Sequence, residues 1–150
     1  MSEAITLVCK ICGGEFVLPA GTMLFPCPAC GTPHSRPRAA GSLLADLRRA
    51  HQQRFACDFT NAAVSYQRVL NVHPDEAEAL WGLALCRYGV EYVQDEKSQT
   101  LMPIVHFLNR RPFTEDPDCL LAIARADRDM RPRYEQDADY IARIQAALND

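Results

Sequence analysis

The sequence predicts a mostly α-helical protein with a small β ribbon at its N-terminal end. Two observations predict this architecture. Residues 5–36 are rich in β-branched residues, glycine, proline and cysteine, which is typical of short strands joined by tight turns. From Ser42 onward, apolar side chains recur at the three- and four-residue spacing of helices. A chain of 150 residues can bury one ordinary core plus a small module that needs another source of stability.

Three strands are expected in the ribbon, at Thr6 to Lys10, Glu15 to Leu18 and Met23 to Phe25. Phe16 and Phe25 are expected to pack within it. The prolines and small residues of Thr32 to Gly41 suit neither a helix interior nor a paired strand, so this stretch indicates a linker. We therefore expect a ribbon at residues 1–36, a linker at 37–41 and a helical domain at 42–150.

About five helices are expected after the linker. A stripe of apolar residues predicts a first helix from about Ser42 to Cys57. Asp58 is a plausible N-cap for a second helix that runs to about Val72 and is closed by Pro74. The stripe of the first helix consists of Leu43, Leu44, Leu47 and Ala50.

The third helix is expected to be the buried central one. Asp75 and Glu78 have the spacing of a capping box, which predicts that the helix begins near Asp75. Apolar residues as far as Val93 cover nearly its whole circumference, so most of its surface should be buried. Trp81 and Tyr88 could line a groove, but large aromatic residues at this spacing on a buried helix favour core positions.

The remaining sequence predicts two more helices. Residues 94–115 alternate polar and apolar stretches with prolines, and the pattern does not decide between strand and loop. Asp116 before Pro117 has the form of a cap and first turn, which predicts a fourth helix. Pro132 should open the last helix, which contains Tyr134 and Ile141.

The strongest chemical signal is a pair of CxxC motifs separated by fourteen residues and formed by Cys9, Cys12, Cys27 and Cys30. In such motifs the backbone turns tightly enough for both sulfurs to reach one ion, and Gly13 and Gly31 permit the positive φ that the turn needs. Four thiolates would complete a tetrahedral shell around one Zn²⁺ and leave no position for water or substrate. We therefore expect one structural zinc ion.

A redox dithiol, an iron–sulfur site and chance cysteines are the alternatives to this zinc site. His34 is expected to be a spare, outside the ligand set. The other three cysteines, Cys57, Cys86 and Cys119, are expected to be buried, inert thiols of apolar helices.

No catalytic constellation is apparent, so we expect a protein that is not an enzyme. The four histidines have no metal-ligand spacing with one another, and the sequence contains no glycine-rich phosphate loop or GxSxG elbow. The odd number of seven cysteines favours metal binding in a reducing compartment over disulfides. Without a long apolar run or a signal-peptide pattern, the expected location is the cytoplasm and no membrane partner is expected.

The charge distribution favours a protein partner over a nucleic acid. Residues 1–74 hold 7 Lys and Arg against 4 Asp and Glu, and residues 75–150 hold 9 against 15. The first part is too weakly basic for a dedicated nucleic-acid binder. The competing hypothesis, a zinc-ribbon nucleic-acid-binding protein, requires a continuous basic surface made by Lys10, Arg36, Arg38, Arg48, Arg49 and Arg54.

Part of the helical region has the pattern of a tetratricopeptide repeat (TPR). Ala62, Tyr66, Val69 and Pro74 match its small, aromatic, small and proline positions, and the next helix begins a second repeat. A generic antiparallel helical bundle is the alternative. Either would present a helical surface to a protein partner, and self-association remains open. The polar residues available on it are Arg48, Arg49, Gln52 and Arg87.

Three pieces of the sequence together resemble the N-terminal region of certain bacterial proteins. These are the two CxxC motifs, the run Trp81-Gly-Leu-Ala-Leu-Cys-Arg-Tyr-Gly-Val-Glu-Tyr-Val93 and Ile141-x-x-Ile-Gln145. In those proteins a zinc ribbon and TPR-like helices precede a Toll/interleukin-1 receptor (TIR) domain. The 150 residues contain no TIR active site. The resemblance therefore implies an adaptor or regulatory module of a bacterial signalling or defence system, with the effector encoded separately.

Overall fold

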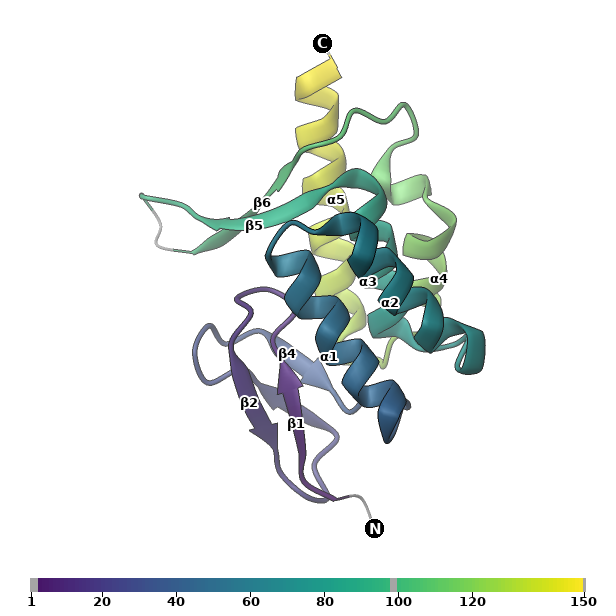
Figure 1. Cartoon of the computed structure of the whole chain (residues 1–150). Helices are drawn as coiled ribbons and strands as arrows, with labels where there is room; N and C mark the ends of the chain where they lie inside the picture. Colours follow the sequence, from purple (N-terminus) through teal and green to yellow (C-terminus); the bar gives the residue numbers. More distant parts are fainter. Residues whose placement is uncertain (1–2, 98–99, 150) are drawn as a thin grey trace.

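In the computed structural model, which describes residues 3–97 and 100–149, five α-helices and three small antiparallel strand pairs form the fold (Figure 1). The β ribbon lies at the N-terminal end of the molecule, below the helices in this view. The predicted mostly helical architecture with a small β part is thus confirmed.

The ribbon consists of two hairpins. β1 (Ile5–Val8) pairs with β2 (Glu15–Leu18), and β3 (Leu24–Pro26) pairs with β4 (Pro33–Ser35). The strand at Glu15–Leu18 lies where the sequence predicts it, but the prediction that the stretch from Thr32 onward contains no paired strand is wrong. Pro33 pairs opposite Pro26 at the end of a two-stranded ribbon. Such a ribbon has only edge strands, where proline is tolerated.

Each of the first four helices packs against the next, and α5 crosses behind them (Figure 1). Asp58 and Asp116 are the predicted caps. The side chain of Asp58 accepts from Asn61 N, and that of Asp116 accepts from Asp118 N and Cys119 N. The helices are α1 (Ser42–Phe55), α2 (Phe59–Val72), α3 (Ala77–Tyr88), α4 (Pro117–Arg125) and α5 (Arg131–Asn149).

The start of α3 differs from the prediction. Its cap, Glu76, makes no side-chain capping bond to the helix, so the capping box of Asp75 and Glu78 is not formed. Asp75 instead pairs with Arg125 at 2.9 Å, and Glu78 is buried. Both carboxylates of the expected motif are therefore used in tertiary contacts.

The end of α3 also differs, because the helix stops at Gly89 in the left-handed conformation. The next residues form β5 (Val90–Gln94), which pairs with β6 (Leu101–Val105) in a hairpin that projects from the helices (Figure 1). The sequence predicts helix as far as Val93. Buried and less buried residues alternate along β5, which is the period of a strand and was hidden by the high apolar content. A 3-10 helix (Phe113–Glu115) follows the hairpin.

Ribbon and helices share one continuous core. Leu7, Phe16 and Leu18 of the ribbon belong to the same buried cluster as the helical residues. In its helical part, Trp81 stacks on Tyr134 with ring centroids 4.6 Å apart, which confirms a core position for Trp81. Among the described residues, no helix has the length and apolar character needed to cross a membrane.

The irregular segment 37–41 is held against the helices. The backbone amides of Arg38 and Ala39 donate to Glu76 Oε1 at 2.9 and 3.1 Å. Ala39 is itself buried in the core. These contacts fix the path of the chain between the ribbon and α1.

Candidate metal centre

The four predicted cysteines come together between the two hairpins of the ribbon. Cys9 and Cys12 lie in the turn from β1 to β2, and Cys27 and Cys30 in the turn from β3 to β4. All four Sγ atoms lie within 4.8 Å of one another. The Cys9–Cys30 and Cys12–Cys27 sulfur pairs are 3.6 and 3.7 Å apart. Tetrahedral thiolates bound at about 2.3 Å to one zinc ion would be separated by roughly 3.8 Å, so the group could hold a metal ion.

The two turns share one backbone pattern. In the first, Cys9 N donates to Gly14 O at 2.8 Å and Gly13 N to Cys9 O at 3.0 Å. The second repeats the pattern around Cys27, with 2.8 Å for both bonds. The φ angles of Gly13 and Gly31 are 79° and 80°, in the left-handed region that favours glycine. The glycines therefore have the conformation that the motif predicts.

Hydrogen bonds favour the thiolate form at the edge of this group. The amides of Ile11 and Cys12 both point at Cys9 Sγ from 3.4 Å, but burial outweighs these bonds and raises the pKa of Cys9 well above its usual range. Thr32 Oγ1 lies 3.1 Å from Cys30 Sγ. Burial by itself would raise the pKa of Cys30, but the hydrogen bonds of Thr32, together with those of Cys9 and Cys12, outweigh it and lower that pKa to about 7. Deprotonated sulfurs are the form that a metal ion binds.

His34, expected to be a spare, contacts the centre. It lies on β4, is buried against Phe16, and its Nε2 is 3.3 Å from Cys9 Sγ. Burial, and then the nearby charge of Lys10, lower the pKa of His34 to about 3. The ring is therefore neutral and can donate its Nε2 proton to the Cys9 thiolate, the role of a residue that orients a metal ligand.

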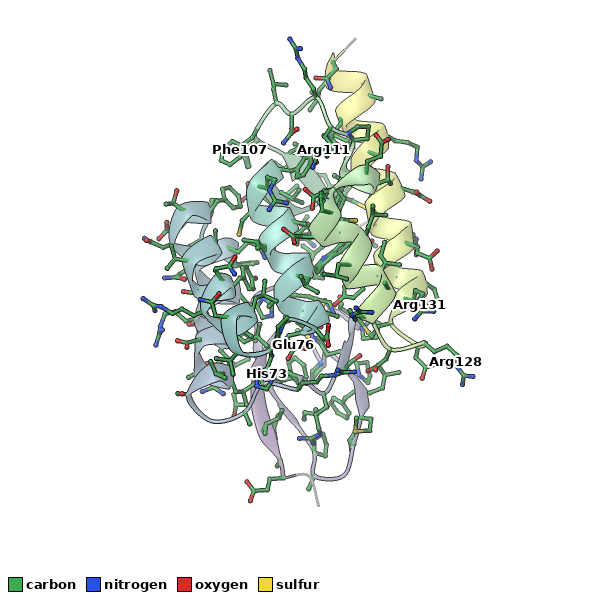
Figure 2. All side chains as sticks on the ribbon, turned by 90° about the vertical axis from the view of Figure 1, so that its right-hand side faces the viewer. His73, Glu76, Phe107, Arg111, Arg128 and Arg131 are labelled. Carbon is green, nitrogen blue, oxygen red and sulfur yellow. The ribbon has the colours of Figure 1, made fainter. Side chains whose placement is uncertain are left out.

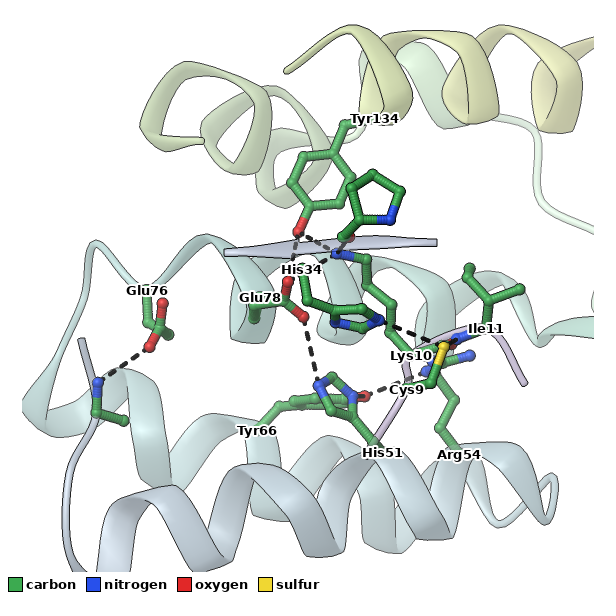
Figure 3. Close-up of polar contacts among 12 residues, drawn as sticks. Cys9, Lys10, Ile11, His34, His51, Arg54, Tyr66, Glu76, Glu78 and Tyr134 are labelled. Atoms are coloured by element: carbon green, nitrogen blue, oxygen red, sulfur yellow. Dashed lines mark hydrogen bonds and ion pairs between the residues drawn. The ribbon is translucent and has the colours of Figure 1, made fainter. Parts of the chain in front are cut away.

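Lys10, between the first two cysteines, points away from the metal centre into the helices (Figure 3). Its Nζ lies 2.7 Å from Glu78 Oε1 on α3 and 3.4 Å from the hydroxyl of Tyr134 on α5. Tyr134 also donates to Glu78 at 3.2 Å. Burial would raise the pKa of Glu78, but Lys10 and the hydrogen bond from His51 outweigh it and hold that pKa well below its usual range.

The buried network continues along α1. His51 Nε2 lies 3.5 Å from the other carboxylate oxygen of Glu78, and its Nδ1 lies 2.6 Å from the Tyr66 hydroxyl. Arg54 donates to the same hydroxyl at 3.1 Å and to the carbonyl of Lys10. The first cysteine turn is thus joined to α1, α2, α3 and α5 by polar contacts that the sequence alone did not indicate.

The basic residues named in the nucleic-acid hypothesis do not all reach the surface. Lys10 and Arg54 are each 2% exposed. Arg36 donates to the carbonyls of Glu3, Thr22 and Pro19 and so closes the base of the ribbon. Arg48 donates to Thr6 O at 3.1 Å. A continuous basic surface is therefore not formed by this set.

Other residues singled out in the sequence also have structural partners. Arg87 pairs with Asp116 at 2.5 Å and Asp118 at 2.7 Å, where it links α3 to α4. Cys86 and Cys119 are buried, and burial raises the pKa of each thiol to about 12, as an inert thiol requires. Cys57 was expected to be similar, but it lies outside α1 and is only half-buried.

A groove of about 320 Å³ runs between α2 and α3, beside the segment that follows β6. Phe107 closes one side of it and packs edge-on against Phe59 with centroids 5.5 Å apart. Phe107 lies at the end of the helices opposite the ribbon (Figure 2). It is 46% exposed, and its neighbour Leu108 is 80% exposed. The apolar lining includes Phe59, Ala63, Leu83, Cys86 and Phe107.

Comparison of the chain with protein-family models, with curated proteins and with solved structures finds no match. Its function is therefore inferred from its own side chains.

Proposed function

We propose that the chain is a zinc-stabilised, non-catalytic protein-interaction module. The four-cysteine centre holds the ribbon, and the helices present the surface that binds a partner. The observation that carries this proposal is the apolar groove between α2 and α3 with Phe107 and Leu108 exposed beside it. Neighbouring large apolar side chains at the surface of a protein of this size are typical of binding sites for other proteins.

Zinc is the ion that this donor set favours. Four sulfur ligands without oxygen or water are typical of structural zinc sites, which contribute directly to folding. All seven cysteines are free thiols. A reducing compartment such as the cytoplasm fits this state.

The packing of successive helices supports a TPR-like reading of the helical part. α1, α2, α3 and α4 pack each on the next, as the helices of such repeats do. Ala62, Tyr66 and Val69, which carry the repeat pattern, are all buried in this packing. An adaptor or regulatory role in a bacterial signalling or defence system, next to a separate effector chain, is consistent with this surface.

Nucleic-acid binding is the less favoured function. Affinity for nucleic acid depends on many exposed cations, whereas Lys10 and Arg54 are buried and Arg36 holds backbone carbonyls.

A capture experiment with two variants of exposed apolar residues tests the proposal. The full chain, loaded with zinc, is used as bait in a lysate of its natural host, together with Phe107→Asp and Leu148→Asp. Both side chains are exposed, but Phe107 lines the groove, whereas Leu148 lies on α5, outside it. We expect a protein that the wild type and Leu148→Asp retain and that Phe107→Asp loses. Equal capture by both variants, or capture only of nucleic acid that is released by salt, would overturn the proposal.

A further inference from the structure

Three side chains with metal-binding atoms meet on the surface away from the four-cysteine centre. Cys57 follows α1, Glu91 lies in β5 and His106 directly follows β6. One candidate ligand atom of each lies within 4.8 Å of those of the other two. The group therefore connects the α1–α2 turn with the base of the β5–β6 hairpin.

The register of the hairpin fixes two of these side chains. Glu91 pairs with Ile104, and the ladder continues past the strands because His106 N donates to Gly89 O at 2.9 Å. Residues two apart on a strand share a face, so Glu91 and His106 are diagonal neighbours on one face of the hairpin. Glu91 Oε1 and His106 Nε2 are 2.8 Å apart.

Cys57 occupies a backbone conformation that glycine normally takes. Its φ is 63°, the one positive φ of a non-glycine residue in the described part of the chain. Cys57 N donates to Arg54 O and Asp58 N donates to Gln53 O, which is the hydrogen-bond pattern of a Schellman motif. A side chain at this position strains the fold relative to glycine, and residues held in this way cluster at functional sites.

The donor set is suited to a borderline transition-metal cation. Thiolate, imidazole and carboxylate together favour ions of the Zn²⁺ class over Mg²⁺ or Ca²⁺, which prefer oxygen alone. Cys57 and Glu91 are half-buried and His106 is exposed, so an ion can reach them. Burial, and then the carboxylate of Glu91, raise the pKa of Cys57, which disfavours a free nucleophilic thiolate. A divalent cation between the two groups would reverse that effect.

We propose that Cys57, Glu91 and His106 bind a second metal ion of the Zn²⁺ class. Three protein ligands leave one tetrahedral position for water or for a donor from another molecule. Unlike the four-cysteine centre, this site is therefore open, and the bound ion joins the hairpin to the turn between α1 and α2.

Cobalt titration tests the proposal. Protein that holds one equivalent of Zn²⁺ is titrated with Co²⁺, and the thiolate-to-cobalt absorption in the near ultraviolet is recorded. Zn²⁺ binds a four-thiolate site more tightly than Co²⁺, so Co²⁺ reports the second site. We expect one further equivalent in the wild type, with native mass spectrometry giving one zinc and one cobalt per chain. Cys57→Gly should abolish the band, because it removes the thiolate.

Ligand and control variants make the result specific. Glu91→Gln and His106→Gln should weaken the second equivalent by more than about tenfold, the loss that even outer-shell changes cause. His73→Gln removes a histidine from the turn after α2 and should leave the binding of the second equivalent of Co²⁺ unchanged. A wild type that shows no second equivalent, or a Cys57→Gly variant that keeps the band, would refute the second site.

Thermal unfolding of Cys57→Gly provides a second readout. Without added metal, this variant should melt at a higher temperature than the wild type, because glycine removes the strain at this φ. With excess Zn²⁺ the wild type should gain stability that the variant does not. A variant that gains as much stability from Zn²⁺ as the wild type would contradict a ligand role for Cys57.

Discussion

At the residue scale, Lys10 has an importance that its surroundings in the sequence do not suggest. A lysine inside a CxxC motif would be expected to project into solvent, yet Lys10 is 2% exposed and its ammonium contacts Glu78. The two residues are 68 positions apart, so no local pattern could pair them. Charged groups in the interior need a partner of opposite charge, because the loss of hydration costs several kcal/mol of free energy for each group.

A double-mutant cycle tests this pair. Lys10→Met should lower the free energy of unfolding by about 3–5 kcal/mol, because it leaves the Glu78 carboxylate buried without its cation. Adding Glu78→Leu should restore much of this loss, since both charges are then absent. Urea denaturation followed by circular dichroism in the presence of zinc measures each term.

The matched control is Arg49→Met, which removes an exposed ion pair with Asp46 and should change stability by less than about 1 kcal/mol. Strictly additive losses from Lys10→Met and Glu78→Leu would show that the two charges do not depend on each other.

At the scale of elements, the sequence predicted those features that depend on interactions between residues close together in the chain. Asp58 and Asp116 indicated the starts of α2 and α4, because an N-cap bonds only to amides in its own first turn. The grouping of the four cysteines in the candidate metal centre was likewise predictable, because each pair lies in one turn. The capping box at Glu78 failed because a tertiary ion pair takes that carboxylate. His34 was missed for a similar reason, since it contacts Cys9 in the other cysteine turn, whereas β5 was missed because its high apolar content hid the period of a strand.

The contact between α2 and α3 gives a prediction about Gly82. In an exposed helix, replacing glycine with alanine stabilises by roughly 1 kcal/mol. A Cβ at Gly82 would overlap the ring of Tyr66, which is buried on the neighbouring helix. Gly82→Ala should therefore destabilise by about 1–3 kcal/mol, the usual cost of overpacking a core.

Differential scanning calorimetry measures this change. Thr60→Ala, on the exposed face of α2, is the comparison in which only helix propensity changes. A Gly82→Ala variant that melts at or above the wild-type temperature would mean that α2 and α3 can separate without cost.

At the scale of the whole molecule, the ribbon and the helices are coupled through their shared core and through the contacts of Lys10. Tyr134 bonds to both Lys10 and Glu78 and stacks on Trp81. A change at the first cysteine turn is therefore two contacts away from the tryptophan in the helical core.

Removal of the metal should change the environment of Trp81, the one tryptophan of the chain. A strong chelator is expected to loosen the ribbon, leave Glu78 without Lys10 and shift Trp81 emission to longer wavelength, and Zn²⁺ should reverse the shift. Fluorescence and thermal melting, each recorded on the wild type and on Cys57→Gly, separate the four-cysteine centre from the proposed second site. If the chelator makes the cysteines reactive but leaves Trp81 emission and the melting temperature constant, the ribbon and the helices would be two independent units.

The contacts of Lys10 also impose an order of events during synthesis. The cysteine turns leave the ribosome before the helices, yet Glu78, the carboxylate partner of Lys10, lies 68 residues beyond Lys10, and Tyr134 lies 124 residues beyond Lys10. The ribbon can therefore complete its buried contacts with the helices only after α3 and α5 have emerged. On the proposal that the four cysteines bind Zn²⁺, all the ligands are present before that point, so metal binding can precede the docking of the ribbon onto the helices.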